Sequence, residues 1–212
     1  MTVPAGIPIT TESPRPDISD AALGLLELKQ GNARFVEARM IHPDQNPETR
    51  LSVSKAQAPF AIVLSCSDSR LPPEVIFDQG LGDLFVVRVA GNIVDPAAMG
   101  SIEYAVSHLG TPLIVVLGHQ NCGAVSATLE ALQPPFHEPH GAVAALITAI
   151  TPAVEVAEKQ PGDLLTNTIK ANVDQSRDQI LHNAELKSAL DSGKLKVVTG
   201  YYSLDDGTAG LA

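Results

Sequence analysis

The segment at 65–70 brings together three side chains that could do chemistry. Its sequence, Ser-Cys-Ser-Asp-Ser-Arg, places Cys66, Asp68 and Arg70 two residues apart. If the backbone stays extended there, the thiol, the carboxylate and the guanidinium all leave the same face of the chain. Such a set would make a poor hydrophobic core, but a serine-rich exposed turn accounts for the same residues. The segment alone therefore does not decide between a functional site and a surface turn.

A second segment, at 118–123, supplies two more side chains of the metal-binding kind. His119 and Cys122 stand three residues apart, between an apolar run and a helical pattern. A cysteine at a helix N-terminus has its thiolate favoured by the helix dipole and the free N–H groups. Taken alone, the pair fits a buried core position better than a ligand pair. Together with Cys66, it becomes two thiolates and one imidazole, a set that selects zinc and leaves a fourth position for water.

The elements that must position these residues are predicted from runs of apolar and β-branched side chains. Strands are expected at 60–64, 84–87, 113–117 and 195–198, and helices at about 95–109, 123–133, 141–158 and 163–190. The alternation predicts an α/β fold, a mainly parallel central sheet flanked by helices. In such sheets, ligands bind beyond the carboxyl ends of the strands. Cys66, just past the first strand, and His119, just past the third, should therefore share one edge.

The N-terminal region is predicted to contain an extended arm and then a helix. Residues 1–17 carry no apolar periodicity and form the arm, whereas 18–212 are expected to form a single domain, since 44% of the chain is hydrophobic. Ser19 or Asp20 can cap the helix. We expect Gly31-Asn32 to break it. The apolar positions of the helix are Ala22, Leu25, Leu26 and Leu28, with Phe35 and Val36 on a following turn.

Charge and cysteine content exclude several classes of protein. With 14 Lys+Arg against 24 Asp+Glu, the net charge of -10 repels phosphate backbones, so no nucleic-acid partner is expected. The longest stretch without a charged residue or a histidine, at 141–154, is too short to span a bilayer, and the first residues lack a signal core. We expect no membrane partner and a cytoplasmic location, although a removed leader would leave no trace. Two cysteines allow a single disulfide, two inert thiols or metal ligands.

Together the two segments resemble the signature of the β-class carbonic anhydrases, Cys-x-Asp-x-Arg followed further along by His-x-x-Cys. The resemblance implies the reversible hydration of CO2 to bicarbonate and a proton by a zinc-bound hydroxide, in a zinc-dependent lyase. It also implies a homodimer or higher homo-oligomer, in which a helical arm near the N-terminus packs on the partner. The likeness extends from Leu25 to the tail and includes the segments 31–35, 88–92, 101–106 and 198–202.

The resemblance assigns a role to each residue of the two segments. Cys66, His119 and Cys122 would hold Zn²⁺. Asp68 would accept a hydrogen bond from the zinc-bound hydroxide or, in a closed state, become a fourth ligand, and Arg70 would decide between the two by holding the carboxylate. Because two thiolates donate more charge to the metal than neutral histidines do, we expect turnover to climb into mildly alkaline pH.

Three further positions match the family's substrate cavity, which lies partly across the dimer interface. By resemblance, Gln57, Phe85 and Tyr104 would bind substrate, with the Gln57 amide able to hydrogen-bond CO2 or bicarbonate. Phe85 and Tyr104 also have simpler explanations. A phenylalanine within a strand is commonly core, and a tyrosine on an apolar helix can simply be packed there.

Departures from the family pattern bear on regulation and on rival functions. In the subset that bicarbonate inhibits, a tryptophan precedes the first cysteine by three positions, but here that residue is Val63 and the chain has no Trp. This favours the open-site subset, although Arg88 resembles another part of the inhibitory pocket. Val89 replaces the family's usual Asn.

Rival functions also have to be considered. A carbonyl sulfide or carbon disulfide hydrolase could use the same zinc site. A non-catalytic dithiol or structural zinc protein is the other rival, but it would have no use for the Asp68–Arg70 pair. A further motif, His137-x-x-His140, could bind adventitious metal only.

Overall fold

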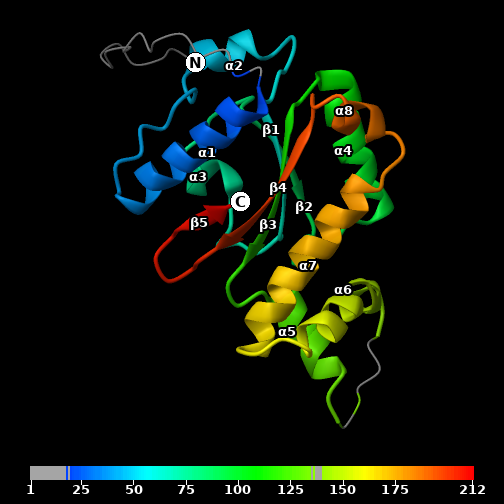
Figure 1. The fold of residues 1–212 in the computed structure, drawn as a ribbon. Helices are drawn as coiled ribbons and strands as arrows, with labels where there is room; N and C mark the ends of the chain where they lie inside the picture. Colours follow the sequence, from blue (N-terminus) through cyan, green and yellow to red (C-terminus); the bar gives the residue numbers. More distant parts are fainter. Residues whose placement is uncertain (1–17, 19, 135, 137–139) are drawn as a thin grey trace.

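Five strands form one sheet in the order β2-β1-β3-β4-β5 (Figure 1). The computed structural model describes residues 18, 20–134, 136 and 140–212, so the expected arm at 1–17, Ser19 and His137 lie outside the described residues. The strands β1 to β4 pair in parallel, and β5 pairs antiparallel with β4. This confirms the mainly parallel sheet. The strand bounds are β1 Ala61–Ser65, β2 Leu84–Arg88, β3 Leu113–His119, β4 Lys196–Tyr202 and β5 Ala209–Leu211.

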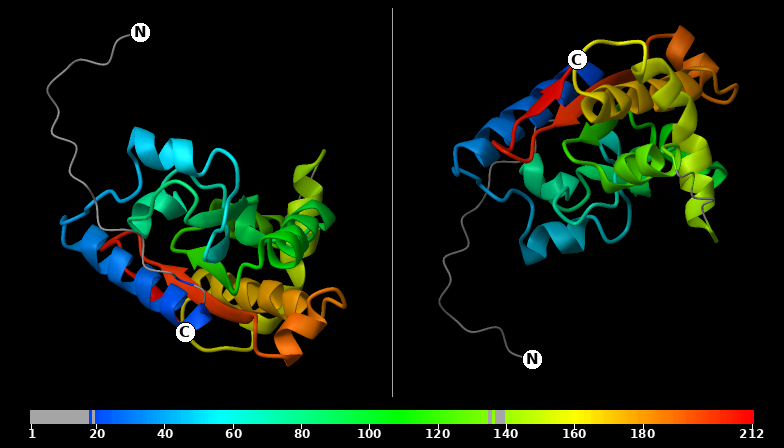
Figure 2. Two further views of the ribbon diagram at one scale, coloured as in Figure 1. Left: turned by 90° about the horizontal axis from the view of Figure 1, so that it is seen from above. Right: turned by 90° about the horizontal axis from the view of Figure 1, so that it is seen from below.

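Helices cover both faces of the sheet (Figures 1 and 2). On β1, Val63 packs in a core with Leu28 of α1 and Ile76 of α3, whereas Ile62 packs on the opposite face with Ile102 of α4. Every residue of β1 and β3 is buried, as expected for strands covered on both faces. The helix bounds are α1 Ala21–Val36, α2 Pro47–Ser52, α3 Pro73–Ile76, α4 Pro96–Leu109, α5 Gly123–Ala131, α6 Val143–Ala157, α7 Leu164–Leu181 and α8 Lys187–Asp191, with a short 3₁₀ turn, η1, at Ala90–Asn92.

The order of the strands places a switch point between β1 and β3. From β1 the chain moves to β2 on one side, and then returns past β1 to β3 on its other side. At such a point, the loops that leave neighbouring strands diverge and open a crevice at the carboxyl edge. Helix α5 starts directly after β3 and lies beyond this edge together with α6 (Figure 1).

The predicted break in the first helix is wrong. Helix α1 runs without interruption through Gly31 and Asn32, and Asp20 caps its start by accepting the N–H of Ala22 at 2.5 Å. Position 31 requires glycine, because a Cβ there would lie 1.8 Å from the carbonyl oxygen of Phe77. The buried Asn32 side chain holds three separate segments together, donating to the carbonyls of Ile76 and Gly207 and accepting the N–H of Ala209. These residues serve packing rather than helix termination.

Other element boundaries also differ from the prediction. The helix expected at 163–190 is divided into α7 and α8, because the Asn183 side chain accepts the N–H groups of Glu185 and Leu186 and turns the chain. The short helices α2 and α3 and the edge strand β5 have too little apolar periodicity to be predicted. Within the described part of the chain, no helix is long and apolar enough to cross a membrane.

Candidate metal centre

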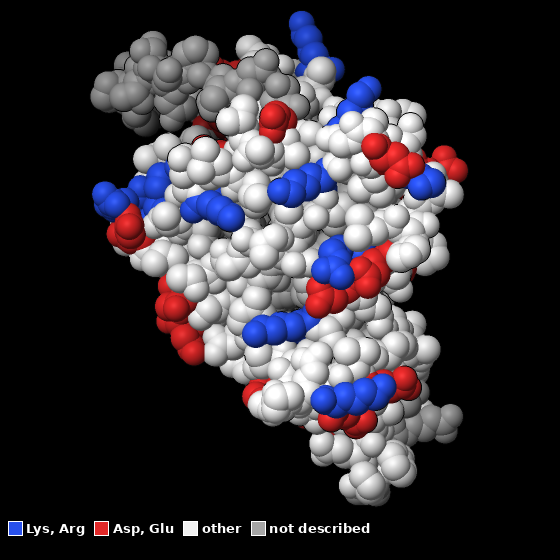
Figure 3. Space-filling model, viewed as in Figure 1, with Lys and Arg blue, Asp and Glu red and all other residues white. Residues whose placement is uncertain are grey.

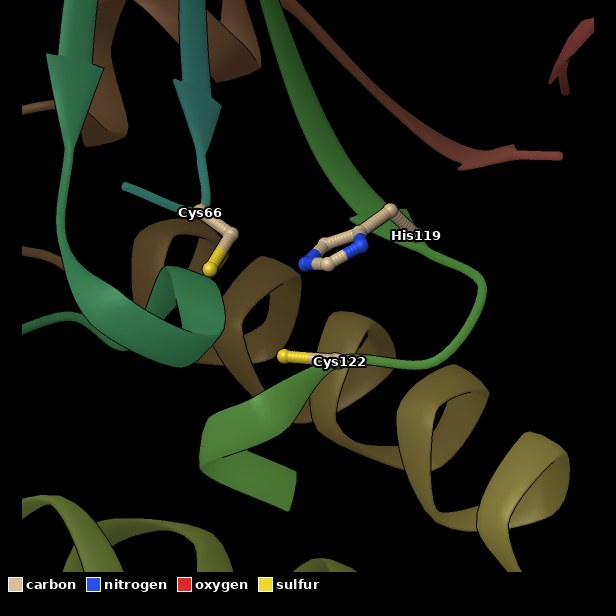
Figure 4. Close-up of side chains that lie close together, drawn as sticks. All are labelled: Cys66, His119 and Cys122. Carbon is tan, nitrogen blue, oxygen red and sulfur yellow. The ribbon is translucent and has the colours of Figure 1, made fainter. Parts of the chain in front are cut away.

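Cys66, His119 and Cys122 converge at the carboxyl edge between β1 and β3 (Figure 4). Cys66 directly follows β1, and Cys122 stands at the N-cap of α5. His119 is the last residue of β3, because the strand continues two residues beyond the predicted end at 117. The two sulfur atoms and a ring nitrogen lie within 4.8 Å of one another, and all three side chains are buried. The structure thus brings together the three predicted ligands.

The ring of His119 is oriented to offer one nitrogen to this cluster. Its Nδ1 lies 2.9 Å from the backbone carbonyl oxygen of Gln120, so the carbonyl favours the proton on Nδ1. Among the described residues, Nε2 has no hydrogen-bond partner, although it is fully buried. An unpartnered buried nitrogen that points at two sulfurs is what a metal ion would satisfy.

Gln120 is itself held in place. Its side chain accepts the backbone N–H of Leu204 at 2.8 Å and donates to the Asp205 carboxylate at 2.7 Å. The carbonyl that orients His119 is therefore fixed by the turn between β4 and β5. Gln120 was not identified from the sequence, because a polar residue between two ligands carries no signal of its own.

The two sulfurs compete for one proton when no cation is present. A hydrogen bond with the Cys122 thiol is the main cause that lowers the pKa of Cys66, and the N–H of Gly91 adds to it. The resulting Cys66 thiolate, together with burial, raises the pKa of Cys122. A divalent cation between the sulfurs would remove this conflict, since both could then be thiolates. The residues present fit a metal ion of the zinc type.

Asp68 and Arg70 form an ion pair beside the cluster. The chain does not stay extended as far as Arg70, because it turns at Asp68, whose carbonyl accepts the N–H of Leu71 at 3.1 Å. The turn brings the guanidinium back onto the carboxylate, at 3.0 Å from Nε to Oδ1 and 2.8 Å from Nη2 to Oδ2. Hydrogen bonds from the Arg70 side chain are the main cause that lowers the pKa of Asp68. The carboxylate is ionised and lies 4.0 Å from His119 Nε2.

Arg88, at the end of β2, clamps the backbone that carries the first ligand. Its Nε donates to the carbonyl of Cys66 at 3.2 Å, and its Nη2 donates to the carbonyl of Asp68 at 2.6 Å. The sequence suggested this residue only as part of an inhibitory pocket. In this chain, its Nε and Nη2 groups already donate to backbone carbonyls of the protein.

The three predicted cavity residues do not surround the cluster within one chain. The rings of Phe85 and Tyr104 lie 6.3 Å apart, and Phe85 packs on the face of the sheet opposite to the core that contains Cys66. Gln57 is exposed, in the loop that leads to β1. The structure therefore brings two of the three together, but away from the ligands of the same chain.

Comparison with known proteins identifies the family. A family model described as carbonic anhydrase matches residues 61–209. A carbonic anhydrase of Mycolicibacterium smegmatis is 43% identical over 185 residues, which cover 87% of this chain and 89% of the relative. The solved β-carbonic anhydrase of Coccomyxa shares 26% identity and a TM-score of 0.68, over 88% of this chain and 83% of that one. This chain belongs to the β-carbonic anhydrase family.

Two further relatives are similar to this β-carbonic anhydrase over most of its length. Carbonic anhydrase 2 of Mycobacterium tuberculosis is 40% identical over 185 residues, again 87% of this chain and 89% of the relative. A tetrameric β-carbonic anhydrase of Sordaria macrospora has the same fold, with a TM-score of 0.69 at 24% identity over 86% of this chain and 93% of that one. The fold predicted from strand and helix patterns is confirmed.

Proposed function

We propose that the protein catalyses the reversible hydration of CO2 to bicarbonate, with Zn²⁺ held by Cys66, His119 and Cys122. The observation that carries the proposal is the convergence of two buried sulfurs and one unpartnered imidazole nitrogen within 4.8 Å, in a chain of this family. When bound, zinc supplies a Lewis acid that acidifies a water molecule at near-neutral pH. Two thiolates would balance the charge of the ion, and with the neutral imidazole of His119 as the third ligand one coordination position would remain for water.

The neighbouring side chains orient the reactants. Asp68, ionised and only 4.0 Å from His119 Nε2, can accept a hydrogen bond from the attacking water and so direct its lone pair toward the carbon of CO2. Arg70 keeps Asp68 in that position by using both carboxylate oxygens. If Arg70 released it, the same carboxylate could move onto the metal and close the site. Asp68 is thus the proposed catalytic residue, and Arg70 controls its position.

The substrate cavity is proposed to be completed by a second copy of the chain. Phe85 packs on the opposite sheet face from Cys66, and the Tyr104 ring lies 6.3 Å from the Phe85 ring, so we propose that both line the cavity of a partner subunit. Tyr104 is 47% exposed and the apolar Leu23 and Leu26 of α1 are 49% and 51% exposed, which an oligomer interface would cover. The Sordaria macrospora relative is a tetramer. A homodimer or higher oligomer, with Gln57 contributing its amide, is therefore proposed.

Several sequence predictions remain proposals. They are one domain over 18–212, a cytoplasmic location and membership of the open-site subset, for which Val63 instead of Trp is the support. Carbonyl sulfide or carbon disulfide hydrolysis has no observation in its favour. On the face shown in Figure 3, Lys and Arg side chains are scattered among Asp and Glu, so no basic patch supports binding of a nucleic acid there.

The proposed function is tested by stopped-flow CO2 hydration, with zinc counted per chain. We expect about one zinc per chain, activity that disappears on metal removal and returns with Zn²⁺, and a much lower rate with carbonyl sulfide. A metal-free protein with full activity, or a faster reaction with carbonyl sulfide, would contradict it.

A further inference from the structure

The turn η1 directs a backbone N–H at one of the proposed metal ligands. The N–H of Gly91 donates to Sγ of Cys66 at 3.2 Å. This direction depends on an unusual backbone, because Gly91 has φ 72° and Asn92 has φ 44°, both in the left-handed region. A Cβ at Gly91 would meet Ile150 at 2.8 Å, so no other residue fits there without a shift.

Two side chains of α7 hold this turn from behind. Asn172 Nδ2 donates to the carbonyl of Gly91 at 2.7 Å, and Ser176 Oγ donates to the carbonyl of Asn92 at 2.9 Å. Both side chains are buried, at 0% and 1% exposure. They stand one helical turn apart and contact two successive carbonyls. The turn is therefore fixed at both peptide groups that follow the donating N–H.

We infer that Asn172 and Ser176 are positioning residues that keep the Gly91 N–H on Cys66 and thereby set how much charge this sulfur donates to the metal. The inference rests on the proposed zinc site. A hydrogen bond to a thiolate ligand withdraws electron density from the sulfur and fixes its orientation, and outer partners of this kind affect metal affinity by about 10–100-fold. Without it, Cys66 becomes a stronger donor that is less rigidly placed.

Packing of α7 on the sheet is the other role that these two residues could have. The hydroxyl of Thr168, one turn of α7 before Asn172, separates the two explanations. It is equally buried, but it donates within the helix to the carbonyl of Leu164 at 2.8 Å, and within the described part of the chain it makes no hydrogen bond to the turn. Thr168→Val and Ser176→Ala thus both delete a buried hydroxyl from the same helix, and only the second releases the turn.

The experiment compares Ser176→Ala, Asn172→Leu and Thr168→Val in the full chain, loaded with Co²⁺ for spectroscopy and with Zn²⁺ for chelator-driven metal loss. In Ser176→Ala and Asn172→Leu we expect the thiolate-to-cobalt charge-transfer band to move to longer wavelength, and zinc loss to become about 10-fold faster. Thr168→Val should change neither, while lowering the thermal midpoint. Ser176→Ala, the smaller change, carries the test if Asn172→Leu does not fold.

The outcomes separate this inference from the proposed function. The positioning role would be overturned if Ser176→Ala had the same charge-transfer band and the same rate of zinc loss as Thr168→Val. The zinc site would still stand in that case, because the wild-type protein holds zinc. A wild-type protein that binds neither metal would overturn the zinc site and the positioning role together.

Discussion

Arg70 holds Asp68 with three hydrogen bonds, two from its guanidinium and one from its own backbone N–H, at 3.0, 2.8 and 2.9 Å. The Asp68 side chain is 16% exposed and the Arg70 side chain is 53% exposed, so the arginine is the more solvent-exposed member of the pair. Oδ2 of Asp68 is also the oxygen that lies 4.0 Å from His119 Nε2. The Asp68 carboxylate thus hydrogen-bonds Arg70 on one side and lies close to the Cys66–His119–Cys122 cluster on the other.

Replacing Arg70 by Ala should release Asp68 onto the metal. We expect CO2 hydration to fall by about 100-fold or more while zinc stays bound, because Asp68 would occupy the position of the attacking water and would no longer orient it. Rates and zinc content measured on the same sample check this. Arg177→Ala is the matched control, since Arg177 pairs with Asp174 and Asp178 on the surface of α7. Loss of zinc from Arg70→Ala would refute this division of roles.

Replacing Cys122 by Ser should remove the metal itself. A second-sphere partner commonly contributes about 10–100-fold to metal affinity, so loss of a direct thiolate should exceed about 100-fold. We expect the purified variant to contain almost no zinc and to have no activity. Ser67→Ala, an exposed neighbour of Cys66, should retain both. Normal zinc content in Cys122→Ser would exclude this residue as a ligand.

The activity should depend on pH in a way set by the two thiolates. Because they donate more charge to zinc than imidazoles do, the acidified water should titrate above about pH 7, the value typical of an all-histidine site. We expect kcat/KM to rise from pH 6 into mildly alkaline pH, as measured by stopped flow in matched ionic strength. A flat profile over about pH 6–9 would argue against this chemistry.

Asp78 should stabilise the fold at neutral pH and lose this effect in acid. Burial opposes its ionisation, but the Arg34 guanidinium and the N–H groups of Ile41 and His42 lower the pKa of Asp78 overall. Asp78→Asn leaves these donors poorly paired and should reduce the free energy of unfolding by about 2–4 kcal/mol near pH 7.

The sign of the pH effect follows from linkage. Since the folded pKa of Asp78 is below the unfolded value of about 3.9, its contribution is present above that pH and is lost as the pH falls through the folded pKa. Urea unfolding of wild type and Asp78→Asn should therefore show a difference in stability that is large at neutral pH and shrinks in acid. A difference that grows in acid would show that the carboxylate is not the stabilising form.

Gly31 and Gly100 offer a matched test of packing against helix propensity. Both lie inside helices, but a Cβ at Gly31 meets the Phe77 carbonyl, whereas a Cβ at Gly100 meets nothing within 4 Å. Gly31→Ala should destabilise the protein by about 1–3 kcal/mol, and Gly100→Ala should stabilise it by about 0.5–1 kcal/mol. Thermal or urea unfolding of both variants is the measurement. Equal effects would mean that the close approach of α1 to α3 is relaxed in solution.

The sequence alone determined the parts that local chemistry controls. Continuous apolar runs specify buried parallel strands, and their alternation with helices specifies which strand ends meet. This was enough to place Cys66 and His119 at one edge, and the His-x-x-Cys spacing brought Cys122 with them. Asp68 and Arg70 followed from the same short segment, although its turn was not anticipated, because an extended and a turned backbone suit the same serines.

Only the tertiary structure decided the contacts that join distant segments. Gly31-Asn32 reads as a helix break locally, yet the approach of α3 and of β5 requires both residues inside α1. Asn172 and Ser176 have no local signal at all, since their partners lie 81 and 84 residues away in the chain. The physical reason is that a hydrogen bond or a close packing contact depends on distance in space. From residue type and spacing in the sequence, this distance can be inferred only for residues of one helix or strand, or for residues at the ends of paired strands.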